Sequence, residues 1–418
     1  MTHPWVRECD WRNAQRATRD LVGEPAHLIA AIFAMVMEPI STATSSIGFT
    51  TLVVVGLLRA PVLWPIWRSM GRELWVKLLL LWIVWSALSI AWSPDPMTGI
   101  DRLWNLKFLA WIPLLWPLHH RWKWLLGGFL CATLVLQGIQ VSGVLFGVKK
   151  HGHLVTAGMR HPTMAGIWNA IALSCWLFLS VVAGWRTLLL ALPMAVACAF
   201  GFFWAGQRAA LVGIIVEIAL ANVILALVAQ GWLKKAITRG LIGIGILCVV
   251  YVVAGDRLTA KVNMATHEVA QSLTGDAPLV MEARLALWQL SLAAWERAPI
   301  IGTGLGGYQS ATEELDVNYG KGDIHDYKTP HSTYIGILTE CGIVGLGLFV
   351  LWSVTFAIKA IQCVRIDPMR VGALGGTIVW FSAAAFDSFN TRGVFLTVGA
   401  IMIALAVMPL SREASAQR

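Results

Sequence analysis

The chain alternates between long apolar blocks and short polar connections along most of its 418 residues. A helix needs about 20 predominantly apolar residues to cross the hydrocarbon core of a bilayer. Twelve blocks approach or exceed that length, and they lie at residues 26–40, 43–60, 74–93, 102–118, 123–147, 163–183, 186–204, 208–230, 236–254, 333–360, 369–387 and 393–411. The pattern therefore predicts an all-α polytopic transmembrane bundle of about 12 spans, with a tight turn at residues 41–46 between the first two.

Composition excludes a water-soluble globule. Hydrophobic residues make up 57% of the chain and charged residues 13%, whereas soluble domains carry about 25% charged residues. Residues 1–25 are basic and polar without an apolar core, so we expect no cleaved secretory signal. The seven cysteines lie mostly inside apolar blocks and form no C-x-x-C pair, which favours small core residues over a disulfide or metal framework. We expect membrane lipids, and no nucleic acid, as partners.

Positive charge in short loops marks the cytoplasmic side of a membrane protein. Alternate connections are basic, and they carry Arg7, Arg12, Arg16 and Arg19, then Arg59, Arg68 and Arg72, then Arg121 and Lys123, then Lys234, Lys235 and Arg239, then Lys359, Arg365 and Arg370, and finally Arg412. Both termini are therefore predicted to be cytoplasmic. The predicted organisation is spans one to nine in residues 1–254, a partly helical outer loop at 255–331, and spans ten to twelve in 332–418.

Several cations nevertheless fall on the predicted outer face. Long loops translocate regardless of charge, which accounts for Arg297 but not for Arg160 and Arg208, because each of these two lies in a short connection at the mouth of a span. Arginines from different loops on one face suggest an anionic ligand, and the guanidinium fork suits phosphate oxygens.

The outer loop contains "EARLALWQLSLAAWERAP", which has helical periodicity. Leu285, Trp288, Leu292 and Trp295 share one face, so we expect a helix that lies along the membrane interface or packs on the bundle and ends at Pro299. Arg284 falls in its first turn, where a positive charge opposes the helix dipole and so hints at another use.

Two further patterns in the outer loops point to cofactors or metals only superficially. "GTGLGGY" at residues 302–308 contains G-x-G-x-x-G, but it follows a helix rather than a strand, so we expect no dinucleotide cofactor. Its glycines are better explained by a tight turn or a close approach to substrate. The histidines and aspartates of the outer loops lack a zinc spacing, so no metal is predicted; they are His151, His153, His161, Asp323, His325, Asp326 and His331.

Two candidate functional residues lie in "TPHSTYIGILTECGIVGLG", residues 329–347, where a polar loop passes into an apolar span. His331 stands at the water boundary. Glu340 follows nine residues later, so on a helix it lies half a turn away in phase and about 13 Å deeper. It is therefore predicted to support the structure, paired with a buried cation or protonated. Glu217 and Lys107 are the other intramembrane charges that could pair.

The stretch "HSTYIGILTECGIVGLG" resembles the H-[NS]-x-x-[LI]-x-x-x-x-E-x-G-x-x-G signature of the O-antigen ligase and polymerase superfamily. Upstream, "ARLALWQLSLAAWERAPIIGTGLGGY" is similar to the family's Arg–Trp helix and glycine-rich turn, while "GQRAALVG" and "RHPTMAG" resemble its arginine-bearing span mouths. These motifs occur in the family's order over about half the chain. Ser332 stands where asparagine is also common.

The resemblance implies a metal-independent glycosyltransferase of the bacterial inner membrane, without a cofactor. It would transfer polysaccharide from undecaprenyl pyrophosphate to a sugar hydroxyl of lipid A–core on the periplasmic side. His331 would be the catalytic base, and Arg160, Arg208 and Arg284 would bind the pyrophosphate. Gln207, Tyr308 and Glu340 would support them. The alternatives are an O-antigen polymerase or a protein O-oligosaccharyltransferase of the same superfamily and, from another class, a transporter.

Overall fold

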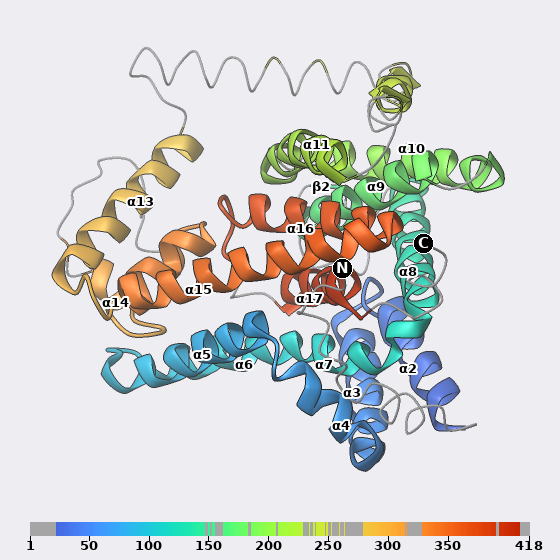
Figure 1. Ribbon diagram of the computed structural model, residues 1–418. Helices are drawn as coiled ribbons and strands as arrows, with labels where there is room; N and C mark the ends of the chain where they lie inside the picture. Colours follow the sequence, from blue (N-terminus) through green and yellow to red (C-terminus); the bar gives the residue numbers. More distant parts are fainter. Residues whose placement is uncertain are drawn as a thin grey trace.

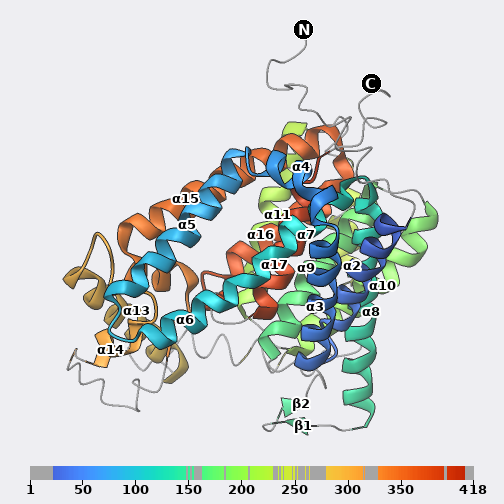
Figure 2. The same cartoon turned by 90° about the horizontal axis from the view of Figure 1, so that it is seen from below.

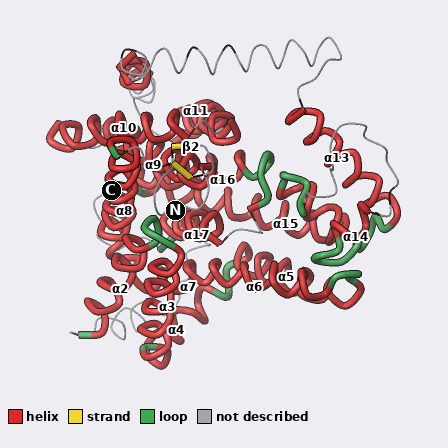
Figure 3. The backbone as a smooth tube through the Cα atoms, turned by 180° about the vertical axis from the view of Figure 1, so that it is seen from behind, coloured by secondary structure: helices red, strands yellow, loops and turns green. Residues whose placement is uncertain are grey.

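The computed structural model describes residues 22–146, 149–150, 153–154, 162–182, 185–205, 208–228, 279–313, 315, 328–389 and 393–409, with short pieces between 234 and 263. The described chain is almost entirely helical (Figure 3), as predicted. Its only described strands are β1 (Lys149–Lys150) and β2 (His153–Leu154), which pair antiparallel.

Most helices lie within the predicted apolar blocks, but α4 (Ala60–Met70) and the start of α6 (Pro96–Asn105) fall in stretches predicted as connections. The first group comprises α2 (Gly23–Met37), α3 (Thr42–Leu58), α4 (Ala60–Met70), α5 (Leu74–Ser89), α6 (Pro96–Asn105), α7 (Trp111–Leu115) and α8 (Trp122–Leu145), with 3₁₀ turns at Ile90–Trp92, Leu106–Ala110 and Trp116–Arg121. The second group comprises α9 (Pro162–Val182), α10 (Trp185–Ala205), α11 (Arg208–Val228), α13 (Leu279–Arg297), α14 (Tyr308–Glu313), α15 (Thr333–Ile366), α16 (Val371–Ala383) and α17 (Gly393–Val407), with a 3₁₀ turn at Pro368–Arg370.

Several of these helices are long and apolar enough to cross a membrane. Among the described residues, Leu74–Trp92, Pro96–Gly143 and Thr333–Ile366 meet that requirement alone, and α3 with α4, bent by 96°, would add a fourth. Six shorter apolar helices accompany them. The protein is therefore a helical membrane protein, while the count of twelve remains a prediction. The expected span at 236–254 is described only in separate pieces, at 237–238, 240–246, 248–249 and 252.

The turn predicted between the first two blocks has a specific cap. The Ser41 side chain accepts a hydrogen bond from the Thr44 backbone N–H, and the Thr44 hydroxyl accepts one from the Ser41 N–H. This reciprocal capping box satisfies two of the amide donors that a helix start leaves unpaired. It fixes the point where α3 begins, directly after α2.

Helix α15 lies at the centre of the arrangement. Figure 1 shows it between α16 on one side and α5 with α6 on the other, and its contacts with α5 are extensive. Trp82 of α5 stacks on Trp352 of α15 with ring centroids 6.3 Å apart and meets Phe349 edge-on at 5.2 Å. Such aromatic pairs contribute about 0.5–1.5 kcal/mol each beyond their burial. Helix α17 is buried on every face, which its uniformly apolar sequence permits.

The helices of the outer loop collect at one end of the molecule. In Figure 2, α13 and α14 lie beside the ends of α5, α6 and α15. Contacts of α13 with α15, and of α14 with both, hold them there. This end contains the mouth of α15, where His331 lies.

Candidate active site

His331 lies immediately before α15, on a backbone held from both sides. The Trp288 indole of α13 donates to the Pro330 carbonyl at 3.0 Å, and the Ser332 side chain caps α15 by accepting from the Ile335 N–H. His331 itself has φ of 51°, in the left-handed region that residues other than glycine adopt uncommonly, asparagine, aspartate and histidine more often than the rest. A conformation of this kind persists where surrounding contacts fix it, and such positions concentrate at functional sites.

The other side of the site is the loop after α16. Thr333 donates its backbone N–H to the Ala384 and Asp387 carbonyls at 2.8 and 3.1 Å, and its hydroxyl donates to the Asp387 carbonyl at 2.8 Å. Asp387 Oδ1 then lies 3.7 Å from His331 Nδ1. This is ion-pair range, although it is longer than a direct hydrogen bond.

The carboxylate gives the two imidazole nitrogens different roles. A negative oxygen on the Nδ1 side favours the tautomer protonated at Nδ1, with Nε2 as the nitrogen that accepts a proton. The His331 side chain is 28% exposed, against 10% for Asp387. The arrangement suits a base that water and substrate reach, oriented by a carboxylate that they reach far less. Asp387 was missed by sequence reasoning, because an aspartate just beyond a span is unremarkable until the fold brings it to His331.

Helix α13 begins at Leu279, before the predicted stretch, so Arg284 lies in its second turn and not in its first. Leu287, Leu290 and Ala294 are buried, whereas Leu285 and Leu292, which share the apolar face noted in the sequence, are 48% and 42% exposed. The Thr339 hydroxyl of α15 donates to the Ser291 carbonyl at 3.2 Å. Small residues therefore allow α13 to approach α15 closely, and the Leu285 face turns outward, as a helix at the membrane interface would require.

Arg284 lies on α13, one helical turn before Trp288, so the two positions share a face of the helix. The Trp288 indole contacts the residue before His331. Arg284 is partly buried. Its role toward a pyrophosphate remains a prediction from the sequence.

The remaining predicted ligands are described less fully. Arg160 and Gln207 lie outside the described residues, and of Arg208 the structure describes only the backbone, as the first residue of α11. His151, His161, Asp323, His325 and Asp326 are also outside them, and so is the His153 side chain. Their proposed roles remain predictions from the sequence.

The glycine-rich turn serves backbone packing. Helix α15 is interrupted at Gly342, which has φ of 67° and ψ of −171°. The break leaves carbonyls and amides unpaired, and the turn pairs them: Thr303 N–H donates to Thr339 O at 2.9 Å, Gly304 N–H donates to Glu340 O at 2.8 Å, and Ile343 N–H donates to Pro299 O at 3.0 Å. In a membrane such groups must be satisfied within the protein. This explains the glycines without any cofactor.

Close contact requires glycine at two of these positions in particular. A Cβ on Gly302 would lie 2.5 Å from the Glu340 carbonyl carbon, and a Cβ on Gly306 would lie 2.3 Å from the Gly99 nitrogen. Both residues also have positive φ, 73° and 90°, which glycine adopts without strain. The turn is therefore packed between α6 and the middle of α15.

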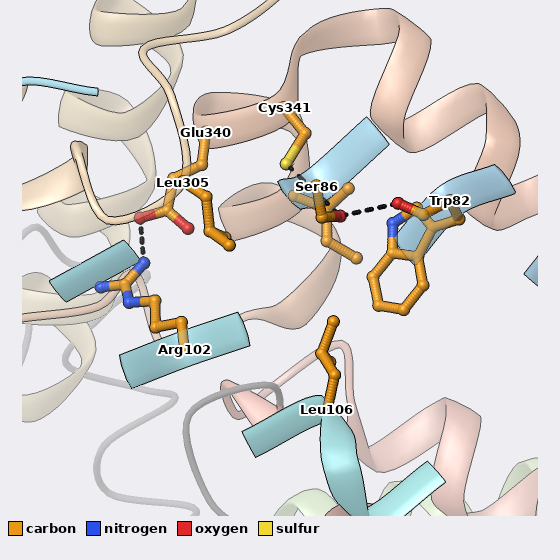
Figure 4. Close-up of a pocket in the computed structure, with 8 residues that line it drawn as sticks. Trp82, Ser86, Arg102, Leu106, Leu305, Glu340 and Cys341 are labelled. Carbon is orange, nitrogen blue, oxygen red and sulfur yellow. Dashed lines mark hydrogen bonds and ion pairs between the residues drawn. The ribbon is translucent and has the colours of Figure 1, made fainter. Parts of the chain in front are cut away.

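Glu340 has the buried cation that the sequence required, and that cation is Arg102 of α6. Arg102 donates to Glu340 Oε1, which also accepts the backbone N–H groups of Gly306 at 3.2 Å and Tyr308 at 3.4 Å. Figure 4 shows the guanidinium and carboxylate facing each other in the wall of a small pocket that Trp82 and Leu106 also line. The other two candidate charges have contacts of their own: Glu217 accepts from the Ser174 hydroxyl at 3.1 Å, and Lys107 lies 4.3 Å from the Trp104 ring.

Tyr308 supports Glu340 through its backbone rather than its phenol. Burial raises the pKa of the Tyr308 phenol to about 12, so this group stays protonated and neutral at ordinary pH. It cannot serve as a base. Its contribution to the site is the N–H donated to Glu340 and the packing of a fully buried ring.

Comparison with known families bears on this same region. Residues 193–350 match a family model described as O-antigen ligase. The matched segment contains Arg208, Arg284, the glycine-rich turn, His331 and Glu340, and it confirms the superfamily resemblance found in the sequence. A search of curated proteins found no match.

Proposed function

We propose that this chain, whose residues 193–350 match the O-antigen ligase family, is a lipid-linked polysaccharide ligase of the bacterial inner membrane. Its donor would be polysaccharide on undecaprenyl pyrophosphate, and its acceptor a sugar hydroxyl of lipid A–core. The product would be complete lipopolysaccharide. The observation that carries this proposal is the pairing of His331 with Asp387 at the start of α15, because His331 lies inside the matched family region.

The transfer would use His331 as general base. Nε2 takes the proton of the acceptor hydroxyl as its oxygen attacks the anomeric carbon of the donor. A glycosidic bond forms, the bond from that carbon to the pyrophosphate oxygen breaks, and undecaprenyl pyrophosphate leaves with both electrons of the broken bond. The imidazolium then returns its proton to water. The pyrophosphate linkage already supplies the driving force, so no nucleotide is needed.

The departing pyrophosphate gains negative charge, and cations stabilise that change. Arg284 would meet it from α13, while Arg160 and Arg208 would meet it from the mouths of α9 and α11. Guanidinium groups suit this task because each offers several N–H donors in a planar fork. Asp387 would act on His331 alone, holding the ring and stabilising the imidazolium.

A deletion strain tests the substrate assignment. A ligase deletion should leave lipopolysaccharide without its O-antigen ladder while long polymers accumulate on undecaprenyl pyrophosphate. A plasmid that carries the wild-type coding sequence should restore the ladder. If the deletion strain instead makes lipopolysaccharide capped with a single repeat unit, the protein is a polymerase. If the ladder is intact and a target protein lacks its glycan, it is a protein oligosaccharyltransferase.

The proposal requires the site to face the periplasm, with both termini in the cytoplasm. The alternation of basic connections motivates this orientation. Alkaline phosphatase, which needs the periplasm to become active, should be active when fused after residue 310 and inactive when fused at the C-terminus. The reverse pattern of activity would invert the topology and refute the proposed site.

Asp387→Asn should lower the rate of transfer without unfolding the protein. The amide keeps the side-chain volume but removes the charge beside Nδ1 and can present an N–H to the ring, which misorients the base. Misplacement of a catalytic group by about 1 Å can cost on the order of 10²-fold in rate. We expect kcat to fall by about that factor while the KM for donor stays within about twofold. An unchanged kcat would remove Asp387 from the mechanism.

A further inference from the structure

The Arg102 guanidinium has a second partner besides Glu340. Its other terminal nitrogen donates to the Lys328 carbonyl at 2.8 Å, three residues before His331. The Arg102 side chain is 8% exposed and that of Glu340 is 1% exposed. One buried cation on α6 therefore connects the interior of α15 to the loop that carries the proposed base.

We propose that Arg102 is a positioning residue for the transfer reaction, holding the segment from Lys328 to His331 in its active conformation. The inference rests on the proposed function of His331. Arg102 is not proposed to contact substrate. Arg102 would act on the reaction only through the backbone of the loop.

The loop geometry shows why such an anchor matters. His331 has a left-handed backbone, which residues other than glycine adopt uncommonly. On its C-terminal side, Thr333 is fixed by the loop that contains Asp387. On its N-terminal side, the fixed points among the described contacts are the Pro330 carbonyl, held by Trp288, and the Lys328 carbonyl, held by Arg102. Loss of the Arg102 contact would leave Pro330 as the remaining anchor before the base.

The chemistry of the Arg102–Glu340 ion pair also indicates that it does more than stabilise the fold. Burying two charges costs desolvation, and apolar residues of similar volume often replace a buried ion pair without loss of stability. A guanidinium, however, can donate to a carboxylate with one arm and to a carbonyl with another. An apolar pair would fill the space but could not hold Lys328. A lysine could neutralise Glu340 but lacks the planar fork that reaches both acceptors.

The backbone donors on Glu340 extend the same connection to the glycine-rich turn. Glu340 Oε1 accepts from Gly306 and Tyr308 as well as from Arg102. The turn, α6, α15 and the His331 loop thus meet at one ion pair. Arg102 is the member that also holds the Lys328 carbonyl, three residues before the proposed base, which makes it the residue to substitute.

The test uses purified full-length protein and two substitutions that preserve folding. Arg102→Lys keeps a cation beside Glu340, and Arg102→Met with Glu340→Met replaces the pair by apolar residues. We expect both to unfold near the wild-type temperature. Transfer kcat should fall by roughly 10- to 100-fold, in the range expected for a misplaced catalytic group, while the donor KM stays within about twofold.

Lys359→Met is the matched control, because it breaks the Lys359–Glu73 ion pair between α15 and the residue before α5, and it should retain the wild-type kcat.

A second readout does not depend on transfer. Diethyl pyrocarbonate modifies accessible imidazoles, and mass spectrometry of the His331 peptide measures its rate at that residue. Arg102→Lys should change this rate by at least about threefold through altered presentation of the ring, whereas Lys359→Met should not.

The outcomes separate the two proposals. Wild-type kcat in Arg102→Lys, or a loss of kcat that only parallels a loss of folded protein in both substitutions, overturns the positioning role. If His331 proves unnecessary for transfer, the proposed base is wrong, and Arg102 is then judged on the modification rate alone: a changed rate at His331 supports the anchor, and an unchanged rate overturns it.

Discussion

His331→Asn should lower the rate of transfer by roughly 10²–10⁴-fold, the usual share of general-base catalysis, while the protein folds and binds donor. Asparagine is the informative replacement because it tolerates the left-handed backbone found at this position. It therefore removes the base without adding backbone strain. Donor binding should persist because arginines, rather than the imidazole, hold the pyrophosphate.

The measurement is transfer by purified protein in nanodiscs at equal folded amounts, with and without a chelator. The chelator should leave wild-type transfer unchanged. Near-wild-type transfer by His331→Asn would reduce His331 to a residue that shapes the start of α15, and His325 would be the next base to test.

Arg284→Ala should weaken transfer by removing a cation from the departing pyrophosphate. A charge-assisted hydrogen bond contributes about 1.5–3 kcal/mol, so the rate constant should fall by roughly 10- to 150-fold. Arg284→Lys should recover only part of it, because an ammonium restores the charge but not the planar fork. We expect the same order of effects for Arg208, which the sequence places at the mouth of a neighbouring span.

The control for this series lies on the same helix. Arg297 is an exposed arginine at the end of α13, and Arg297→Ala should transfer normally. Steady-state kinetics with purified donor separate the effects of each substitution on kcat and KM. Should Arg284→Ala bind donor and react as wild type does, the pyrophosphate would have to be held by other cations.

The glycine-rich segment shows how tertiary context gives a motif its meaning. Its spacing alone matches a nucleotide-binding loop, and only its position after a helix argued against that reading. In the structure, the amides of Thr303 and Gly304 pair with carbonyls exposed by the break at Gly342. The same glycines that would suit a phosphate instead allow backbone to approach backbone inside an apolar environment, where an unpaired group is costly.

Sequence alone determined the class of fold. Long apolar blocks admit only a helical membrane protein, since each block must satisfy its own backbone hydrogen bonds. Local patterns also singled out His331 and Arg284 as candidates, and their roles stay predictions. Glu340 was expected either to pair with a buried cation or to be protonated, because a charge at that depth is costly when unpaired.

The identity of each partner was decided by the tertiary structure. Arg102 lies 238 positions from Glu340, and Asp387 lies 56 positions from His331, so no local period relates either pair. The sequence likewise left open whether the Leu285 face of α13 lies along the membrane interface or packs on the bundle. The structure buries Leu287, Leu290 and Ala294 and leaves Leu285 and Leu292 exposed. Periodicity reports which residues avoid water or enter lipid, whereas partners depend on how the helices pack in three dimensions.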